Sequence, residues 1–194
     1  DRPPTGRVGV PSSRSSSEYL VVREDQLCRV PDAMTDAEAA AFSIGAQTAY
    51  SMVRKMAVRR GDAVLVTAAR SNTSLFLIAA LRAAGAHVVA TTTAVDSVAA
   101  LTSHGASCVV SLAMPEAEGG LDALRAEAHR VGGFTAVADP FFDRHLCHVL
   151  EFLVPSGRYV TCGFHGQHDA IGNAAPPDYA LALQVAMMKN LSII

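Results

Sequence analysis

From residue 63 to the end of the chain, short apolar runs alternate with longer segments whose apolar residues recur at helical spacing. The short runs are rich in β-branched residues, which favour strands. We expect strands at Ala63–Thr67, Ala86–Thr91, Ser107–Ser111, Phe134–Ala138, Arg158–Cys162 and Leu191–Ile194, and helices at Thr73–Ala84, Val95–His104, Leu121–Val131, Asp143–Leu153 and Asp178–Lys189. Because strand and helix alternate strictly, the pattern predicts a doubly wound, six-stranded parallel α/β sheet.

Individual residues mark several of these boundaries. Gly85 and Gly105 follow two of the expected helices, at the position where glycine adopts left-handed backbone angles without steric cost. Pro177 precedes the last helix, and proline is common in the first turn of a helix.

The first 62 residues have a different pattern. Residues 1–17 are rich in Pro, Gly, Arg and Ser, which predicts an irregular arm. Thr35 and Glu38 form a T-x-x-E capping box, which predicts the start of a helix. The elements expected here are strands at Glu18–Val22 and Gln26–Val30, a short helix through Ala41, and a second helix from Ala46 to Met56.

The composition is that of an ordinary globular protein. The 194 residues are 50% hydrophobic and carry a formal net charge of −2. No block of Lys and Arg indicates a nucleic-acid partner, and no apolar run is long enough to span a membrane. No signal peptide is visible, so we expect a cytoplasmic protein. Cys28, Cys108, Cys147 and Cys162 form no CxxC pair, and we expect them to be reduced, buried thiols.

The expected fold predicts where a ligand would bind. In a doubly wound sheet the site lies beyond the carboxyl ends of the strands, close to the point where the strand order reverses. The segments expected to form its rim are Ala68–Ser74, Thr91–Thr93, Asp139–Phe142 and Gly163–His168.

Three segments carry a family resemblance. SSEYLVVREDQLCRVPDAMTDAEAAAFSIGAQTAYSMVRKMAVRRGDAVLVTAA, PSGRYVTCGFHG and KNLSII follow one another in the order and spacing typical of the medium-chain dehydrogenases/reductases, which this chain resembles from about Glu18 onward. The resemblance implies a Rossmann-type cofactor-binding domain at residues 46–194. It implies a remnant of a β-rich, GroES-like catalytic domain at residues 1–45, so we expect the chain to be incomplete.

The turn after the first strand departs from the family pattern. The three glycines of G-x-G-x-x-G would fall at Ala69, Ser71 and Ser74. Ser71 places a Cβ where a phosphate would approach, and Ser74 crowds the contact between helix and strand. We expect Asn72, which tolerates positive φ, to relieve the turn.

Two interpretations of this turn remain open. The backbone N–H groups and hydroxyls of Ser71, Asn72, Thr73 and Ser74 surround a helix N-terminus, which attracts anions, and Arg70 adds a positive charge. Alternatively, Ser71 or Asn72 merely caps the helix and Arg70 points into water.

A second departure concerns the ribose. The second strand ends in Thr91, Thr92 and Thr93 rather than in the carboxylate that would bind both ribose hydroxyls of NAD. A 2′-phosphate is therefore not repelled, which favours NADP(H) as the cofactor. Asp96 follows, and we expect it to cap the next helix.

The resemblance also implies the nicotinamide end of the site and the absence of zinc. Thr48, and Gly163, Phe164 and His165 after the fifth strand, would lie beside the nicotinamide, with Asp139 on the rim, and no catalytic residue is assigned. Tyr50 is expected to pack. Ile44 occupies the position of the family's zinc-binding Cys and cannot bind a metal, which indicates the zinc-independent quinone oxidoreductases and enoyl reductases. These reduce an activated C=C bond with NADPH.

Other features remain ambiguous. His145 and His148 share a helix face but have too few partners for a metal, so we expect solvated or half-buried histidines. Phe141 and Phe142 are expected to narrow the cofactor groove. They favour a second hypothesis, a pseudo-dehydrogenase whose domain serves dimerisation, docking or non-redox chemistry. In either case the apolar edge strand Leu191–Ile194 predicts a homodimer, and the other expected partner is a small-molecule substrate.

Overall fold

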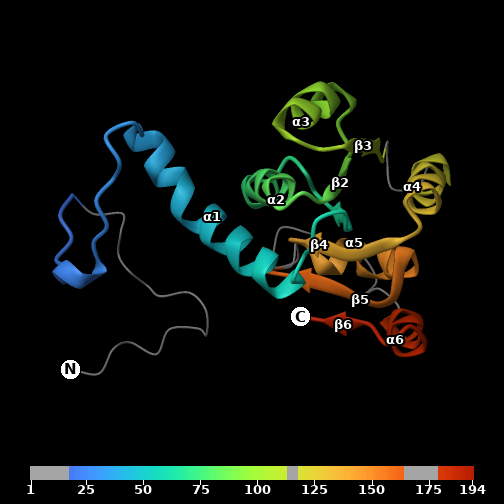
Figure 1. Ribbon diagram of the computed structural model, residues 1–194. Coiled ribbons are helices and arrows are strands. Elements are labelled where there is room, and N and C mark those ends of the chain that lie inside the picture. The colour runs from blue at the N-terminus through green and yellow to red at the C-terminus, as the bar shows by residue number, and fades with distance from the viewer. Residues whose placement is uncertain (1–17, 113–117, 164–178) are drawn as a thin grey trace. The chain divides into compact units, whose positions relative to one another are not determined.

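The structure, a computed structural model, describes residues 18–112, 118–163 and 179–194 (Figure 1). Its contacts divide the chain into a first unit, Asp1–Ala39, and a second unit, Ala40–Ile194. Among the described residues, no helix is long and apolar enough to cross a membrane.

The first unit has little regular structure in its described part. It contains the 3₁₀ helix η1 (Glu24–Gln26) and the start of α1 (Asp36–Met56). The strands expected at Glu18–Val22 and Gln26–Val30 are wrong, because these residues form no ladder. A strand needs a neighbour to satisfy its backbone groups. Val21 is 100% exposed, so here an apolar run marks no buried element.

Helix α1 begins as predicted but is continuous. The backbone N–H and the hydroxyl of Thr35 both donate to Glu38 Oε2 at 2.8 Å, and Glu38 N donates back to Thr35 Oγ1 at 3.3 Å, which confirms the capping box. The prediction of two helices is wrong, because Gly45 does not interrupt α1. Gly45 is buried, and a Cβ there would lie 2.6 Å from Asn72 and 3.0 Å from Phe76. Its role is to allow close packing.

The second unit contains the predicted sheet. Its strands are β1 (Ala63–Val66), β2 (His87–Thr92), β3 (Cys108–Ser111), β4 (Phe134–Asp139), β5 (Leu153–Thr161) and β6 (Ser192–Ile193). All pairs are parallel, in the order β3-β2-β1-β4-β5-β6, which confirms the doubly wound, Rossmann-type fold. The connecting helices are α2 (Asn72–Ala83), η2 (Val95–Ser97), α3 (Val98–His104), α4 (Glu118–Val131), α5 (Phe142–Val149), η3 (Leu150–Phe152) and α6 (Tyr179–Met188).

One boundary differs clearly from the prediction. Strand β5 starts at Leu153, five residues before its predicted start at Arg158, and Leu153 itself was predicted as the last residue of the preceding helix. Phe134 of β4 pairs with Leu153, but Ala136 pairs with Arg158, so the register of β5 against β4 shifts between these two pairs, as at a β-bulge. The two glycines marked as helix ends do adopt left-handed angles, with φ of +81° at Gly85 and +128° at Gly105.

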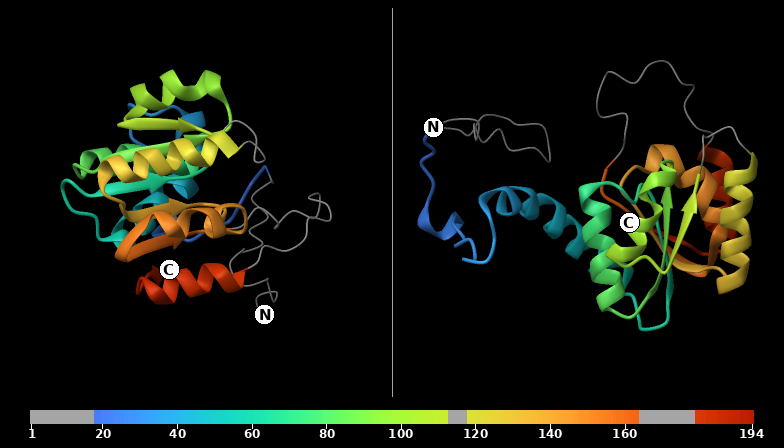
Figure 2. Two further views of the ribbon diagram at one scale, coloured as in Figure 1. Left: turned by 90° about the vertical axis from the view of Figure 1, so that its right-hand side faces the viewer. Right: turned by 90° about the horizontal axis from the view of Figure 1, so that it is seen from above.

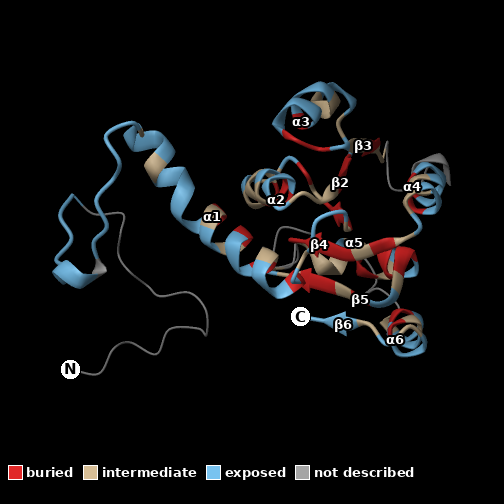
Figure 3. Ribbon diagram, in the orientation of Figure 1, coloured by how far each residue is buried: buried red, intermediate tan, exposed pale blue. Residues whose placement is uncertain are grey.

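The core of the second unit lies on both faces of the sheet. Side chains alternate along each strand, so Val64 and Val66 of β1 face one side and Ala63 and Leu65 the other. Buried residues of α1, α2 and α3 cover the first face, and those of α4, α5, η3 and α6 cover the second (Figures 2 and 3). The sheet is therefore the middle of three layers.

The cysteines are less buried than expected. All four are free thiols, but Cys28 and Cys162 are exposed and Cys108 and Cys147 only partly buried. Cys28 lies in the irregular segment before α1 and Cys162 follows the last residue of β5, so neither reaches a core face.

Truncation of a core side chain tests this packing. Leu77 of α2 is 0% exposed within the first-face core, so Leu77→Ala should lower the free energy of unfolding by about 2–5 kcal/mol in urea titration. Leu181→Ala on α6 removes the same atoms from a side chain that is 64% exposed, and should cost less than about 1 kcal/mol. Equal losses would contradict the assigned layers.

Candidate functional site

A cavity opens at the carboxyl ends of the strands. It lies where the strand order reverses, since β2 and β3 extend the sheet on one side of β1 and β4 lies on the other. Its volume is about 400 Å³. It brings together the turn after β1, the end of β2 and the beginning of α5. The lining residues are Ala68, Ala69, Arg70, Ser71, Thr91, Thr92, Thr93, Leu112, Phe141, Arg144 and His145.

The turn after β1 closes without glycine because Ala68 takes the strained position. Ala68 has a φ of +45°, whereas Asn72, expected to relieve the turn, lies in the first turn of α2. Ser71 N donates to Ala68 O at 2.9 Å, and Ala69 N donates to Thr91 O at 3.0 Å. Ala69, at the position of the first lost glycine, is fully buried and is not among the residues with positive φ, so this position does not need a glycine's backbone freedom.

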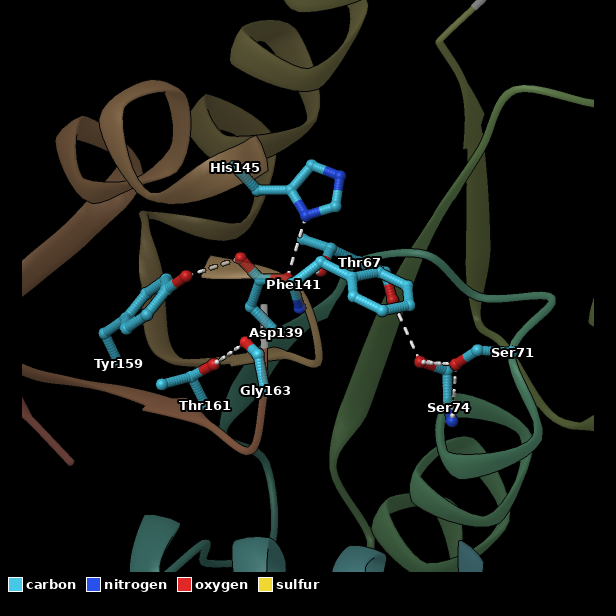
Figure 4. A network of polar contacts seen from close by, with 9 residues as sticks. All are labelled: Thr67, Ser71, Ser74, Asp139, Phe141, His145, Tyr159, Thr161 and Gly163. Atoms are coloured by element: carbon cyan, nitrogen blue, oxygen red, sulfur yellow. Dashed lines mark hydrogen bonds and ion pairs between the residues drawn. The ribbon is translucent and has the colours of Figure 1, made fainter. Parts of the chain in front are cut away.

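Ser71 and Ser74 stand at the second and third glycine positions of the motif, and their side chains form a chain of hydrogen bonds (Figure 4). Ser71 caps α2, since its Oγ accepts from Ser74 N at 3.2 Å and donates to Ser74 Oγ at 2.9 Å. Ser74 Oγ in turn donates to Thr67 O at 3.0 Å. The buried hydroxyl of Ser74 therefore links α2 to the end of β1. The side chain that was expected to crowd this contact instead forms a hydrogen bond across it.

The remaining residues of the turn point in different directions. Asn72 Nδ2 donates to Ala41 O on α1 at 2.9 Å, which directs its side chain away from the cavity. Arg70 is exposed and lines the cavity, and Thr73 is partly buried outside the lining.

The end of β2 contributes three threonines to the cavity. Thr91 and Thr92 are buried and Thr93 is exposed. Thr92 Oγ1 accepts from Ala94 N at 3.1 Å and lies 2.9 Å from Ser97 Oγ, so Thr92 organises the entry to η2. The prediction that Asp96 caps the next helix is wrong, since Ala94 and Ser97 occupy the cap positions and Asp96 is exposed within η2.

A buried carboxylate lies beneath the cavity at the end of β4. Asp139 is 0% exposed, and Oδ1 accepts from Thr67 Oγ1 at 2.6 Å, Phe141 N at 2.9 Å and His145 Nδ1 at 2.8 Å. Oδ2 accepts from the hydroxyl of Tyr159 (Figure 4). Burial by itself would raise the pKa of Asp139, but the hydrogen bond and charge of His145, with the hydroxyls of Thr67 and Tyr159, outweigh it and hold the pKa below its usual range.

The same network keeps Tyr159 neutral. Burial, then the charge and hydrogen bond of Asp139, raise the pKa of Tyr159 far above its ordinary value, so the phenol remains a donor. Sequence reasoning placed Asp139 on the rim but missed Thr67, Tyr159 and His145 as its partners. A sequence signal existed: an Asp ends a buried strand, and a His follows six residues later in a helix that starts between them.

The two histidines and two phenylalanines after β4 separate into different roles. His145 contacts Asp139 and lines the cavity, whereas His148 is exposed. Phe141 lines the cavity, but Phe142 packs into the second-face core, its ring centroid 6.4 Å from that of Tyr179. The expectation that both rings narrow the groove therefore holds for Phe141 and is wrong for Phe142.

Thr48 lies in a separate hollow at the end of β5. This hollow has a volume of about 380 Å³ and is lined by Gln47, Thr48, Ser51, Met52, Lys55, Thr161 and Cys162. Gly163 O accepts from Thr161 Oγ1 at 3.2 Å, while Phe164 and His165 lie outside the described residues. Ile44 is 80% exposed, and Tyr50 is 65% exposed, so the expectation that Tyr50 packs is wrong.

The depressed pKa of Asp139 predicts acid sensitivity. The ionised carboxylate stabilises the fold above the ordinary Asp pKa of 3.8, and this contribution is lost as the pH falls toward the lower pKa of the folded state. Asp139→Asn should lower the free energy of unfolding at pH 7 by about 2 kcal/mol or more, and the difference from wild type should shrink below about pH 4.

Urea titrations of both proteins between neutral and acid pH measure this difference. Asp122→Asn, in an exposed pair with Arg125, is the matched control and should change little at any pH. A difference between wild type and Asp139→Asn that stays constant from pH 7 to about pH 3 would show that the charge of Asp139 does not stabilise the fold.

Sequence comparison finds neither a protein family nor a curated protein that matches this chain. Comparison of structures does find similar folds. An NAD-dependent alcohol dehydrogenase has 26% identity and a TM-score of 0.75, over 93% of this chain and 49% of that one. The quinone oxidoreductase of Thermus thermophilus, also solved with NADPH, has 24% identity and a TM-score of 0.70, over 89% and 50%. The CurK enoyl reductase has 22% identity and a TM-score of 0.67, over 86% and 46%.

These three proteins confirm the resemblance to the medium-chain dehydrogenases/reductases. The present chain spans about half the length of each solved chain, 46 to 50%.

Proposed function

We propose that this chain, whose fold is that of a medium-chain dehydrogenase/reductase, binds NADP(H) and serves as the cofactor domain of an NAD(P)H-dependent oxidoreductase. The observation that carries the proposal is the cavity at the reversal of strand order. Among its described lining residues are Arg70, Arg144 and four hydroxyl side chains, with no carboxylate. Such a lining suits a phosphorylated ligand, and the NADPH complex of the similar quinone oxidoreductase supports this choice.

The residues of the cavity fit one half of a dinucleotide. Ser71 and Arg70 lie at the N-terminus of α2, where phosphate groups are favoured by the helix dipole and by the guanidinium. Thr91 and Thr93 would face the adenosine ribose, and the missing carboxylate at the end of β2 leaves room for a 2′-phosphate. The hollow beside Thr48 and Thr161 is our proposed position for the nicotinamide.

The proposed reaction is hydride transfer to an activated C=C bond of a quinone, enone or enoyl substrate. NADPH supplies the hydride, and the chain positions it. Ile44 at the position of the metal-binding Cys supports the zinc-independent branch, in which the substrate carbonyl itself withdraws electrons. We assign no catalytic residue, and the substrate class rests on the similar quinone oxidoreductase and enoyl reductase.

Two observations favour the second hypothesis, a pseudo-dehydrogenase. Ser71 Oγ and Ser74 N, two polar groups at the start of α2, already bond to each other. Phe141 also occupies part of the cavity wall. A domain that uses these groups internally could keep the fold for dimerisation or docking without binding a nucleotide.

Calorimetric titration with NADPH and NADH distinguishes the two hypotheses. We expect NADPH to bind more tightly than NADH, and Ser71→Arg to abolish binding because its longer side chain fills the cavity at the start of α2. Ser103→Arg, on the exposed face of α3, is the matched control and should bind as wild type does. Absence of heat with both nucleotides, in a folded wild-type chain, would favour the pseudo-dehydrogenase.

We also propose that the chain forms a homodimer through the edge strand Leu191–Ile194. β6 is the last strand in the sheet order, and Ile193 and Ile194 are 44% and 40% exposed. Met187 and Met188 on the adjoining α6 are 82% and 79% exposed, which extends the apolar surface. Pairing with a second copy would satisfy the outer edge of β6.

Sedimentation velocity at tens of micromolar tests the dimer. The wild-type chain should sediment as a dimer, and Ile193→Lys should sediment as a monomer because a charge at the edge opposes pairing. Val95→Lys, at an exposed apolar residue of η2, is the control and should leave the dimer intact. A strictly monomeric wild-type chain at this concentration would disprove the proposal.

A further inference from the structure

His145 lies between the buried network and the cavity. It belongs to the first half of α5, lines the cavity beside Phe141 and Arg144, and keeps 24% of its side chain exposed. Its Nδ1 lies 2.8 Å from Asp139 Oδ1. The sequence predicted only a solvated or half-buried histidine at this position, with no role in the site.

The network determines which ring nitrogen faces the ligand. An ionised carboxylate can only accept hydrogen bonds, so His145 Nδ1 carries the proton in this contact. Nε2 is therefore the nitrogen left for the cavity, and Figure 4 shows it on the side of the ring away from Asp139. Because Thr67, Phe141 N and Tyr159 hold the carboxylate from other directions, the orientation of the imidazole is determined as well.

The imidazole of His145 can take up a second proton, which would place a donor on Nε2. A buried carboxylate is costly unless an opposite charge compensates it. Among the described residues that contact Asp139, Thr67, Tyr159 and the Phe141 amide are neutral donors, and His145 is the one that can carry a positive charge. A protonated ring presents a charge-assisted Nε2–H donor to the cavity, on the same wall as the guanidinium of Arg144.

We propose that His145 binds a phosphate group of the ligand through Nε2, and that Asp139 is the residue that positions it. The proposal rests on the proposed function in that the phosphate belongs to NADP(H). Two phosphates share the required chemistry, the pyrophosphate and the 2′-phosphate.

Calorimetry with three probes tests the proposal: NADPH, NADH and inorganic pyrophosphate. His145→Gln keeps a polar side chain but removes the ring that can carry a positive charge, and should weaken phosphate binding about 10-fold or more, the loss expected for one charged hydrogen bond. His148→Gln, one helical turn away and exposed, is the matched control and should bind as wild type. Loss for NADPH alone assigns the 2′-phosphate, and loss for all three probes assigns the pyrophosphate.

The remaining outcomes separate this proposal from the proposed function. Unchanged affinity of His145→Gln for every probe that the wild-type chain binds would overturn the role of His145. Pyrophosphate binding that depends on His145, without binding of either nucleotide, would support the phosphate site and reject the cofactor. A wild-type chain that binds none of the three probes would overturn both.

Nitrogen-15 spectra of the imidazole test the positioning role without relying on a folded His145 variant. In the wild-type chain, pyrophosphate should shift the Nε2 signal of His145 more than its Nδ1 signal, and leave His148 unchanged. In Asp139→Asn the Nδ1 proton should lose its strong hydrogen bond, and pyrophosphate affinity should fall. A shift confined to Nδ1, or equal shifts at His148, would contradict the assigned geometry.

Discussion

The cavity depends on one buried negative charge. Asp139 ends β4 without solvent contact, so its carboxylate requires donors from every side. Thr67 follows β1, Tyr159 belongs to β5, and Phe141 N and His145 lie at the start of α5. These contacts tie together the two halves of the sheet where the strand order reverses. The hydrogen bonds that compensate the burial of this carboxylate therefore also hold the residues at the floor and one wall of the cavity.

The turn after β1 shows that this path from strand to helix does not require the three glycines of the family motif. Ala68 accepts left-handed backbone angles, and the Ser71–Ser74–Thr67 chain of hydrogen bonds joins α2 to β1 where a glycine would allow bare contact. Non-glycine residues at positive φ are strained by about 1 kcal/mol or more, so the surrounding hydrogen bonds must hold this turn. The fold therefore keeps the turn's path while changing the atoms that line it.

The sheet was predictable from the sequence because burial on both faces leaves long apolar runs, as in Val64–Val66, and glycines such as Gly85 end the helices between them. The strand expected at Glu18–Val22 failed because local pattern does not reveal whether a partner strand is present. The rim segments followed from the fold, but the partners of Asp139 did not. Thr67, His145 and Tyr159 are far apart in sequence, and their convergence depends on strand register and on the direction in which α5 starts.

The brevity of α5 has a consequence for how this site can change. Phe141, Arg144 and His145 all lie at the beginning of an eight-residue helix. The aromatic ring, the guanidinium and the imidazole therefore belong to one short segment of helix, which the hydrogen bonds to the Asp139 carboxylate hold in place. An insertion or deletion between β4 and α5 would displace all three together. The chemistry of this wall can thus evolve by exchanging side chains in place, while the length of the connection is constrained.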